Sequence, residues 1–274
     1  MKTHDENYLD AETTKVMDLL SVRRTRRNLL KGATVAGGGV VALSTAALLL
    51  PKGVTHASGS GDAEATSETS QKDIFSIAAT AERLAVTFYK HGVAHADELG
   101  LHGPSLAAIK AALVEEQIHE LFFVANGGVP LTSTFSFPHA DDTFESLALF
   151  IATQQQLEGV FDAAFIAAVK EFCQLGSPRL AQIACQVAMI ESEHRVLGRY
   201  IAEQAGLNGF GPPADNWAYA PALLESVSDA PAVVAAAGYL SPKPGNTFTY
   251  EQVSIDMESV VYRTPFTVGE DGED

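Results

Sequence analysis

The sequence is poor in cysteine and in basic side chains. Its 274 residues contain two cysteines, Cys173 and Cys185, which excludes a disulfide scaffold and a multi-cysteine zinc or iron–sulfur site. Lysine and arginine number 18 against 34 acidic residues, so the formal charge is −16. This balance argues against a nucleic-acid binder, because phosphate contacts need clustered basic side chains. The apolar content of 46% is too high for a disordered acidic chain, and the length suffices for a core without cross-links.

The N-terminal region carries the pattern of an export signal. A basic run at residues 23–31 precedes the uncharged residues 32–50, and residues 55–58 (Thr-His-Ala-Ser) have the small-x-small pattern that a signal peptidase accepts. Within the basic run, the segment TRRNLLK resembles the twin-arginine export signal. We therefore expect residues 1–57 to be a twin-arginine signal peptide read by the Tat export machinery, and residues 58–71 to be a flexible linker.

The expected destination is the periplasm, the cell envelope or the extracellular space. The alternative is an N-terminal membrane anchor formed by an uncleaved signal, since about 19 residues just reach across the hydrocarbon core. Three glycines at positions 37–39 keep the uncharged stretch only mildly hydrophobic, which favours cleavage.

Four long helical segments are predicted between residues 72 and 206. They cover residues 73–99, 104–125, 143–175 and 178–206, and short Gly-containing turns join the first to the second and the third to the fourth. The connection at residues 126–142 is long enough to run the length of a helix. Two antiparallel pairs joined by one long crossover predict an all-α bundle with ferritin-like connectivity.

Residues 207–274 lie beyond these helices and are expected to form a C-terminal extension. Short helices are predicted at residues 221–227 and 230–240, the periodicity of residues 248–262 is ambiguous, and the chain ends in an acidic tail.

Each predicted helix places a carboxylate in its apolar seam. Glu82 and Glu158 interrupt the seams of the first and third helices, and the second and fourth carry the only Glu-x-x-His sequences of the chain. The i, i+3 spacing puts both side chains on one helix face, where they can hold one ion. No lysine or arginine falls in the seams to neutralise the acids. The pattern predicts a metal site formed by Glu82, Glu116, His119, Glu158, Glu191 and His194.

This set resembles the ligands of ferritin-like di-iron and di-manganese carboxylate proteins, over residues 73–206. The resemblance implies that Glu82 and Glu158 are the carboxylates that two of the helices contribute singly. It also implies that Glu116 and Glu191 bridge both metals and that His119 and His194 each cap one. Two iron ions are the expected cofactor, with two manganese ions as the alternative.

The same resemblance argues against haem and against a rubrerythrin-like relay. Gln117 stands where bacterioferritins carry a haem-binding methionine, so no haem is expected. The cysteine set of a rubredoxin-like relay is absent. A homo-oligomer is possible, but the extension is foreign to minimal cage-forming ferritins.

The resemblance implies a stress-related oxidoreductase with ferroxidase or peroxide-removing activity. Ferrous ion and dioxygen or peroxide would be its substrates. Two alternatives stay open at this point: manganese-catalase-like disproportionation of peroxide, and a metal-free or metal-stabilised structural bundle, as in a non-catalytic envelope or desiccation-related protein.

Three further residues are expected near the ligands. Tyr89 is seven residues after Glu82 and is predicted either to act beside the ligands, even as a radical carrier, or simply to pack in the core. Gln154 precedes Glu158 by one turn and could hydrogen-bond a ligand. Asp162 follows Glu158 by one turn and is predicted either to orient a histidine or to lie in solvent.

Overall fold

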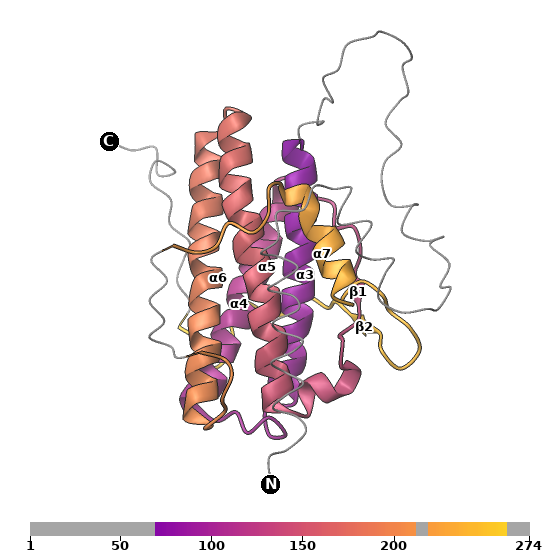
Figure 1. Cartoon of the computed structure of the whole chain (residues 1–274), viewed down its shortest axis with the longest axis vertical. Helices are drawn as coiled ribbons and strands as arrows, with labels where there is room; N and C mark the ends of the chain where they lie inside the picture. Colours follow the sequence, from indigo (N-terminus) through magenta and orange to yellow (C-terminus); the bar gives the residue numbers. More distant parts are fainter. Residues whose placement is uncertain (1–68, 212–218, 262–274) are drawn as a thin grey trace. The chain divides into compact units, whose positions relative to one another are not determined.

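Four long helices run side by side in the computed structural model, which describes residues 69–211 and 219–261 (Figure 1). They are α3 (Gln71–Ala94), α4 (Gly103–Ala125), α5 (Leu147–Gln174) and α6 (Pro178–Gln204). The helix α3 packs on α4 and α5 packs on α6, so the all-α bundle of two helix pairs is confirmed. The predicted signal peptide, most of the linker and the acidic tail lie outside the described residues. Within the described part of the chain, none of the helices has both the length and the apolarity to cross a membrane.

The helix ends differ from the sequence-based prediction at two places. The first helix stops at Ala94 rather than near Leu99, and the chain then turns until Gly100, whose φ of +66° suits a residue without a side chain. The third helix begins at Leu147, after a separate 3-10 turn η2 (Ala140–Phe144), because Ser146 caps it by accepting a hydrogen bond from the backbone N–H of Leu149.

The crossover between α4 and α5 is held along one face of α3. Side chains spaced about one turn apart on α3, Ser76 and Thr80, accept hydrogen bonds from the backbone N–H groups of Val129 and Leu131. Two extended residues advance about 6.6 Å and four helical residues advance about 6 Å, so the two periodicities match. The crossover thereby runs parallel to α3 and delivers the chain to the start of α5.

The C-terminal extension packs on the bundle. It contains the turn η3 (Val227–Asp229), the short helix α7 (Ala230–Ala236) and the strand β2 (Phe248–Thr249), which pairs antiparallel with β1 (Thr134–Phe135) in the crossover. The predicted helix at 221–227 is wrong, since those residues are irregular up to η3, and the predicted helix at 230–240 is shorter than expected. In the described part of the ambiguous 248–262 segment, which ends at residue 261, only Phe248 and Thr249 form a strand.

An aromatic cluster ties the crossover, the extension and the bundle together. The ring of Phe88 stacks on that of Phe150 at 4.5 Å, and the ring of Phe137 packs edge-on against Phe248 at 4.8 Å. The close approach of Phe150 requires Gly92, since a Cβ there would lie 2.4 Å from the ring. The described strand of the extension is therefore part of the folded core.

Candidate metal centre

All six residues expected to be metal ligands meet in the middle of the bundle. The four helices each contribute, through Glu82 on α3, Glu116 and His119 on α4, Glu158 on α5, and Glu191 and His194 on α6. The four carboxylates and His194 are at most 1% exposed, and the side chain of His119 is 12% exposed. The structure therefore brings the six side chains together, and their role as metal ligands stays a prediction.

The six residues form two overlapping groups that share two glutamates. One group is Glu82, Glu116, His119 and Glu191, and the other is Glu116, Glu158, Glu191 and His194; within each, one ligand atom per residue lies within 4.8 Å of the rest. Each group could hold a metal ion.

The shared glutamates divide their oxygens between the two histidines. Nδ1 of His119 lies 3.5 Å from Oε2 of Glu116 and 3.6 Å from Oε1 of Glu191. Nδ1 of His194 lies 3.0 Å from Oε1 of Glu116 and 3.5 Å from Oε2 of Glu191. The other two glutamates each face one histidine, with Oε2 of Glu82 3.7 Å from His119 and Oε1 of Glu158 3.5 Å from His194. Two acids are thus placed to bridge and two to serve one position each.

The buried acids lack the hydrogen bonds that such groups normally have. Both oxygens of Glu82, Glu116 and Glu191, one oxygen of Glu158, and Nδ1 of each histidine have no hydrogen-bond partner of good geometry. Buried polar atoms are nearly always paired, so this set of acceptor atoms facing one another fits cations. Two divalent ions would balance the four carboxylate charges.

Without a cation, burial and mutual repulsion shift the protonation of the acids. Burial, followed by the charge of Glu116, raises the pKa of Glu82 well above its usual range, and the same two causes raise the pKa of Glu191. Burial also acts to raise the pKa of Glu116, but the close approach of Glu82, His119 and His194 outweighs burial and lowers this pKa. Burial acts to lower the pKa of His194, but nearby acidic groups, Glu158 among them, outweigh burial and raise this pKa. The raised pKa values of Glu82, Glu191 and His194 therefore all favour the protonated forms in the bare centre.

Tyr89 and Gln154 contact the ligands, as one of the predicted alternatives expects. The hydroxyl of Tyr89 donates to Oε1 of Glu158, and the amide of Gln154 donates to the Tyr89 hydroxyl at 3.1 Å and to the carbonyl of His194 at 2.8 Å. Gly198 makes room for this amide, because a Cβ there would lie 1.7 Å from Oε1 of Gln154. These contacts fix Glu158 and the backbone of His194 in place.

Asp162 is placed differently from both sequence-based alternatives. Its carboxylate is buried and accepts hydrogen bonds from Ser192 at 3.0 Å and from Arg195 at 3.1 Å, so it neither orients a histidine nor lies in solvent. The fourth helix supplies these partners on the side that faces α5. Asp162 thus joins α5 to the turn of α6 that carries Glu191 and His194.

Glu115 also contacts a histidine of the cluster and was not predicted from the sequence. Its Oε2 lies 2.9 Å from Nε2 of His194, although the rest of its side chain is 40% exposed. This hydrogen bond fixes the ring with Nδ1 facing the shared glutamates, and in the neutral imidazole Nδ1 would offer its lone pair to a cation held there. The adjacent acidic pair Glu115-Glu116 was the available signal, since neighbouring positions on a helix point about 100° apart and can reach two different partners.

A second polar cluster connects the extension to the helix that carries His119. The Gln117 side chain hydrogen-bonds the Tyr250 hydroxyl and accepts from the backbone N–H of Val253 at 2.9 Å. Arg83 pairs with the buried Glu120 at 2.8 Å and lies over the ring of Tyr250. The position at which bacterioferritins carry a haem-binding methionine is here an anchor for the extension.

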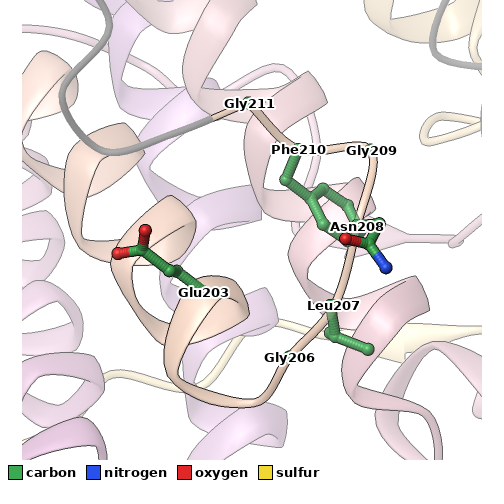
Figure 2. Close-up of a pocket in the computed structure, with 7 residues that line it drawn as sticks. All are labelled: Glu203, Gly206, Leu207, Asn208, Gly209, Phe210 and Gly211. Carbon is green, nitrogen blue, oxygen red and sulfur yellow. The ribbon is translucent and has the colours of Figure 1, made fainter.

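A surface pocket of about 290 Å³ lies at the C-terminal end of α6 (Figure 2). Its lining contains no histidine and a single acid, and consists of Glu203, Gly206, Leu207, Asn208, Gly209, Phe210 and Gly211. It shares no residue with the carboxylate cluster and lacks the donor set of a metal site.

Comparison with known protein families agrees with the fold. Residues 70–204 match the ferritin-like domain family, a span that includes all six clustered side chains and ends with α6. Over these residues the chain is similar to a ferritin-like domain. Searches among curated proteins and among solved structures each found no match. The extension from residue 207 lies outside the family match.

Proposed function

We propose that this chain is an exported di-iron protein that oxidises ferrous ion with peroxide or dioxygen. The observation that carries the proposal is the division of the Glu116 and Glu191 oxygens between two histidine-capped groups, which provides two neighbouring positions joined by shared ligands. A single-ion site would need neither shared carboxylates nor a second histidine.

Two iron ions held together would supply the two electrons that convert one peroxide molecule and two protons into two waters, leaving two ferric ions. The surrounding residues contribute burial and fixed geometry. Glu82 and Glu191 hold protons in the bare centre and release them as cations bind, so loading does not require a buried excess of charge. The aromatic and aliphatic core around the cluster excludes bulk water.

Export by the twin-arginine route is supported by the arginine pair and the mildly hydrophobic stretch that follows it. This route, as the resemblance implies, carries proteins that are already folded and often already loaded. The test is to replace Arg26 and Arg27 together by lysine. Accumulation of the precursor inside the host cell supports the proposal, and unchanged export contradicts it.

Metal content is the decisive measurement for the centre. Protein recovered from its own host should contain close to two iron ions per chain, and Glu158→Ala and His194→Ala should each abolish stoichiometric loading while the helical circular dichroism is kept. Oxygen or peroxide consumption on addition of ferrous ion then tests the reaction. Variants that load as well as the wild type would show that the ligands are misassigned.

Two outcomes would redirect the proposal. A centre that contains manganese and evolves gas from peroxide indicates catalase-like disproportionation, for which the thiolate-free ligand set is equally suited. A host-derived chain without iron or manganese indicates a structural bundle.

A further inference from the structure

The two halves of the centre are related by the internal repeat of the bundle, and this allows a position-by-position comparison. The repeat equates α3 with α5 and α4 with α6, so Glu82 corresponds to Glu158 and His119 corresponds to His194. The ligands themselves are therefore the same in the two halves. The residues that support the ligands are not.

The first difference is the hydrogen bond to the histidine ring. Glu115 precedes the bridging Glu116 and accepts from Nε2 of His194. The equivalent residue before the other bridging glutamate is Ile190, which has no acceptor. Among the residues that the structure describes, no side chain accepts a hydrogen bond from Nε2 of His119.

The second difference is the support of the glutamate that faces only one histidine. Glu158 accepts a hydrogen bond from Tyr89, seven residues after Glu82. The residue seven after Glu158 is Phe165, which has no hydroxyl, and both oxygens of Glu82 are without a hydrogen-bond donor.

The third difference is the polar bridge between α5 and α6. Gln154, one turn before Glu158, holds Tyr89 and the carbonyl of His194, and Gly198 gives it space. The equivalent positions are Ala78 and Phe123, and Phe123 stacks on Phe165 at 5.7 Å. In this half of the centre, apolar side chains thus stand where the other half has the hydrogen-bonded Gln154.

Solvent exposure follows the same division. The His194 side chain is fully buried, whereas His119 is 12% exposed. A ligand whose orientation is fixed by a hydrogen bond and shielded from water holds its ion more firmly than an unsupported ligand near the surface, and removal of such support typically weakens metal affinity about 10–100-fold.

We propose that the two metal positions are unequal: the His194 position retains its ion, and the more exposed His119 position binds weakly and exchanges with solvent. This inference rests on the proposed function, because it requires that both positions bind metal. In a ferrous-ion oxidase, the exchanging position would take up substrate ferrous ions and release ferric ions. Two substrate ions taken up in turn would supply the two electrons that one peroxide molecule needs, so the ion kept at the His194 position would end each cycle in its starting oxidation state.

Titration of the chelator-stripped full-length chain with Mn²⁺ tests this, with free Mn²⁺ followed by electron paramagnetic resonance. The wild type should show a tight class and a weak class of site. His119→Ala should keep only the tight class, and His194→Ala should lose it. Sites that fall in one affinity class, or a tight class that disappears in His119→Ala, would overturn the inference.

Substitutions at two supporting positions test the cause of the unequal affinities without altering a proposed ligand. Glu115→Ala should weaken the tight class about 10–100-fold and leave the weak class unchanged, with partial rescue in Glu115→Gln, which keeps an acceptor oxygen. Ile190→Gln should strengthen the weak class by offering His119 an acceptor. The exposed Glu193, next to His194 in sequence, provides the matched control Glu193→Ala, which should change neither class.

The outcomes distinguish this inference from the proposed function. Failure of the wild type to bind Mn²⁺ or Fe²⁺ would overturn both. Two ions bound with one affinity would overturn only the inequality of the positions. An unaltered tight class in Glu115→Ala would overturn the hydrogen bond from His194 to Glu115 as the cause of that inequality.

Discussion

Replacing Glu82 by glutamine tests whether the metal-free centre opposes folding. Glutamine has nearly the shape of glutamate but no charge, and Glu82 has no hydrogen-bond donor that the change would leave unpaired. The substitution therefore removes a buried acid and little else. We expect the stripped variant to be more stable than the stripped wild type at neutral pH, although it binds metal less well.

The sign of the pH dependence follows from the raised pKa values. A carboxyl whose folded-state pKa is raised contributes its full stability below its unfolded pKa, here near 4.5, and loses that contribution as the pH rises through the folded value. Glu82 and Glu191 both behave in this way, and the raised pKa of His194 acts in the same direction above its usual 6.5. The metal-free wild type should therefore lose stability between about pH 5 and pH 8.

The magnitude is bounded by the pH interval. From pH 4.5 to about pH 7.5 a group that stays protonated in the folded state costs about 1.4 kcal/mol per pH unit, which gives a ceiling of about 4 kcal/mol. Replacing buried charges by neutral groups of similar volume typically stabilises proteins by about 1–4 kcal/mol. At about 2–4 °C per kcal/mol for a domain of this size, Glu82→Gln should raise the melting temperature of the stripped protein by roughly 2–15 °C.

Thermal unfolding followed by circular dichroism after chelation measures this effect. The difference between variant and wild type should be largest near pH 8 and should shrink toward pH 5. The exposed Glu98 provides a control, Glu98→Gln, which should leave the melting temperature unchanged. A stripped Glu82→Gln that melts below the wild type at neutral pH would show that the acid is paired favourably and that the burial argument is wrong.

Addition of metal should reverse the order of stability. Each site filled at about 100 times its dissociation constant adds about 2.7 kcal/mol, so two sites should raise the wild-type melting temperature by roughly 10–20 °C. The melting temperature of Glu82→Gln should rise clearly less on addition of metal, because the group around His119 then has one carboxylate fewer.

Three further predictions follow from the surroundings of the centre. Gly198→Ala should expel the Gln154 amide and cost about 1–3 kcal/mol in unfolding free energy, measured by denaturant titration, with a lower metal content. Gln117→Leu should detach the segment around Tyr250 and Val253, seen as faster hydrogen exchange there with α5 and α6 unaffected. Metal binding at about pH 7 should release protons from the two carboxyls of raised pKa, measured by calorimetry in buffers of different ionisation enthalpy; equal heats in all buffers would contradict the protonation described here.

The sequence was sufficient for the bundle and for the ligand cluster because both depend on local periodicity. Helix length and turn position follow from the placement of apolar residues and glycines, and an acid in an apolar seam is visible as an exception. The two Glu-x-x-His sequences identify residues on one helix face without any knowledge of the partner helices. The predictions of where α3 ends and where α5 begins were less accurate. Several polar residues near the start of α5 could cap the helix, and the sequence does not show that Ser146 does so.

The contacts of the extension could not be predicted, because they join residues far apart in sequence. Nothing in the local pattern of Gln117 indicates that its amide holds Tyr250 and Val253, which come more than a hundred residues later. The same is true of Asp162, whose partners on α6 depend on the rotation of one helix against another. The sequence of a single helix does not distinguish an acid that lies in solvent from a buried acid that is paired with a neighbouring helix.

Glu115 was only partly predictable: its position next to Glu116 is visible in the sequence, whereas its contact with His194 depends on how α4 packs against α6. The two ligand tetrapeptides make the halves of the centre look equivalent, and the residue before each one, Glu115 in α4 and Ile190 in α6, makes them different. Glu115 on α4 reaches across to His194 on α6, so its carboxylate supports only that histidine. A bundle built from two similar helix pairs can therefore hold two positions of the same ligand chemistry and unequal strength.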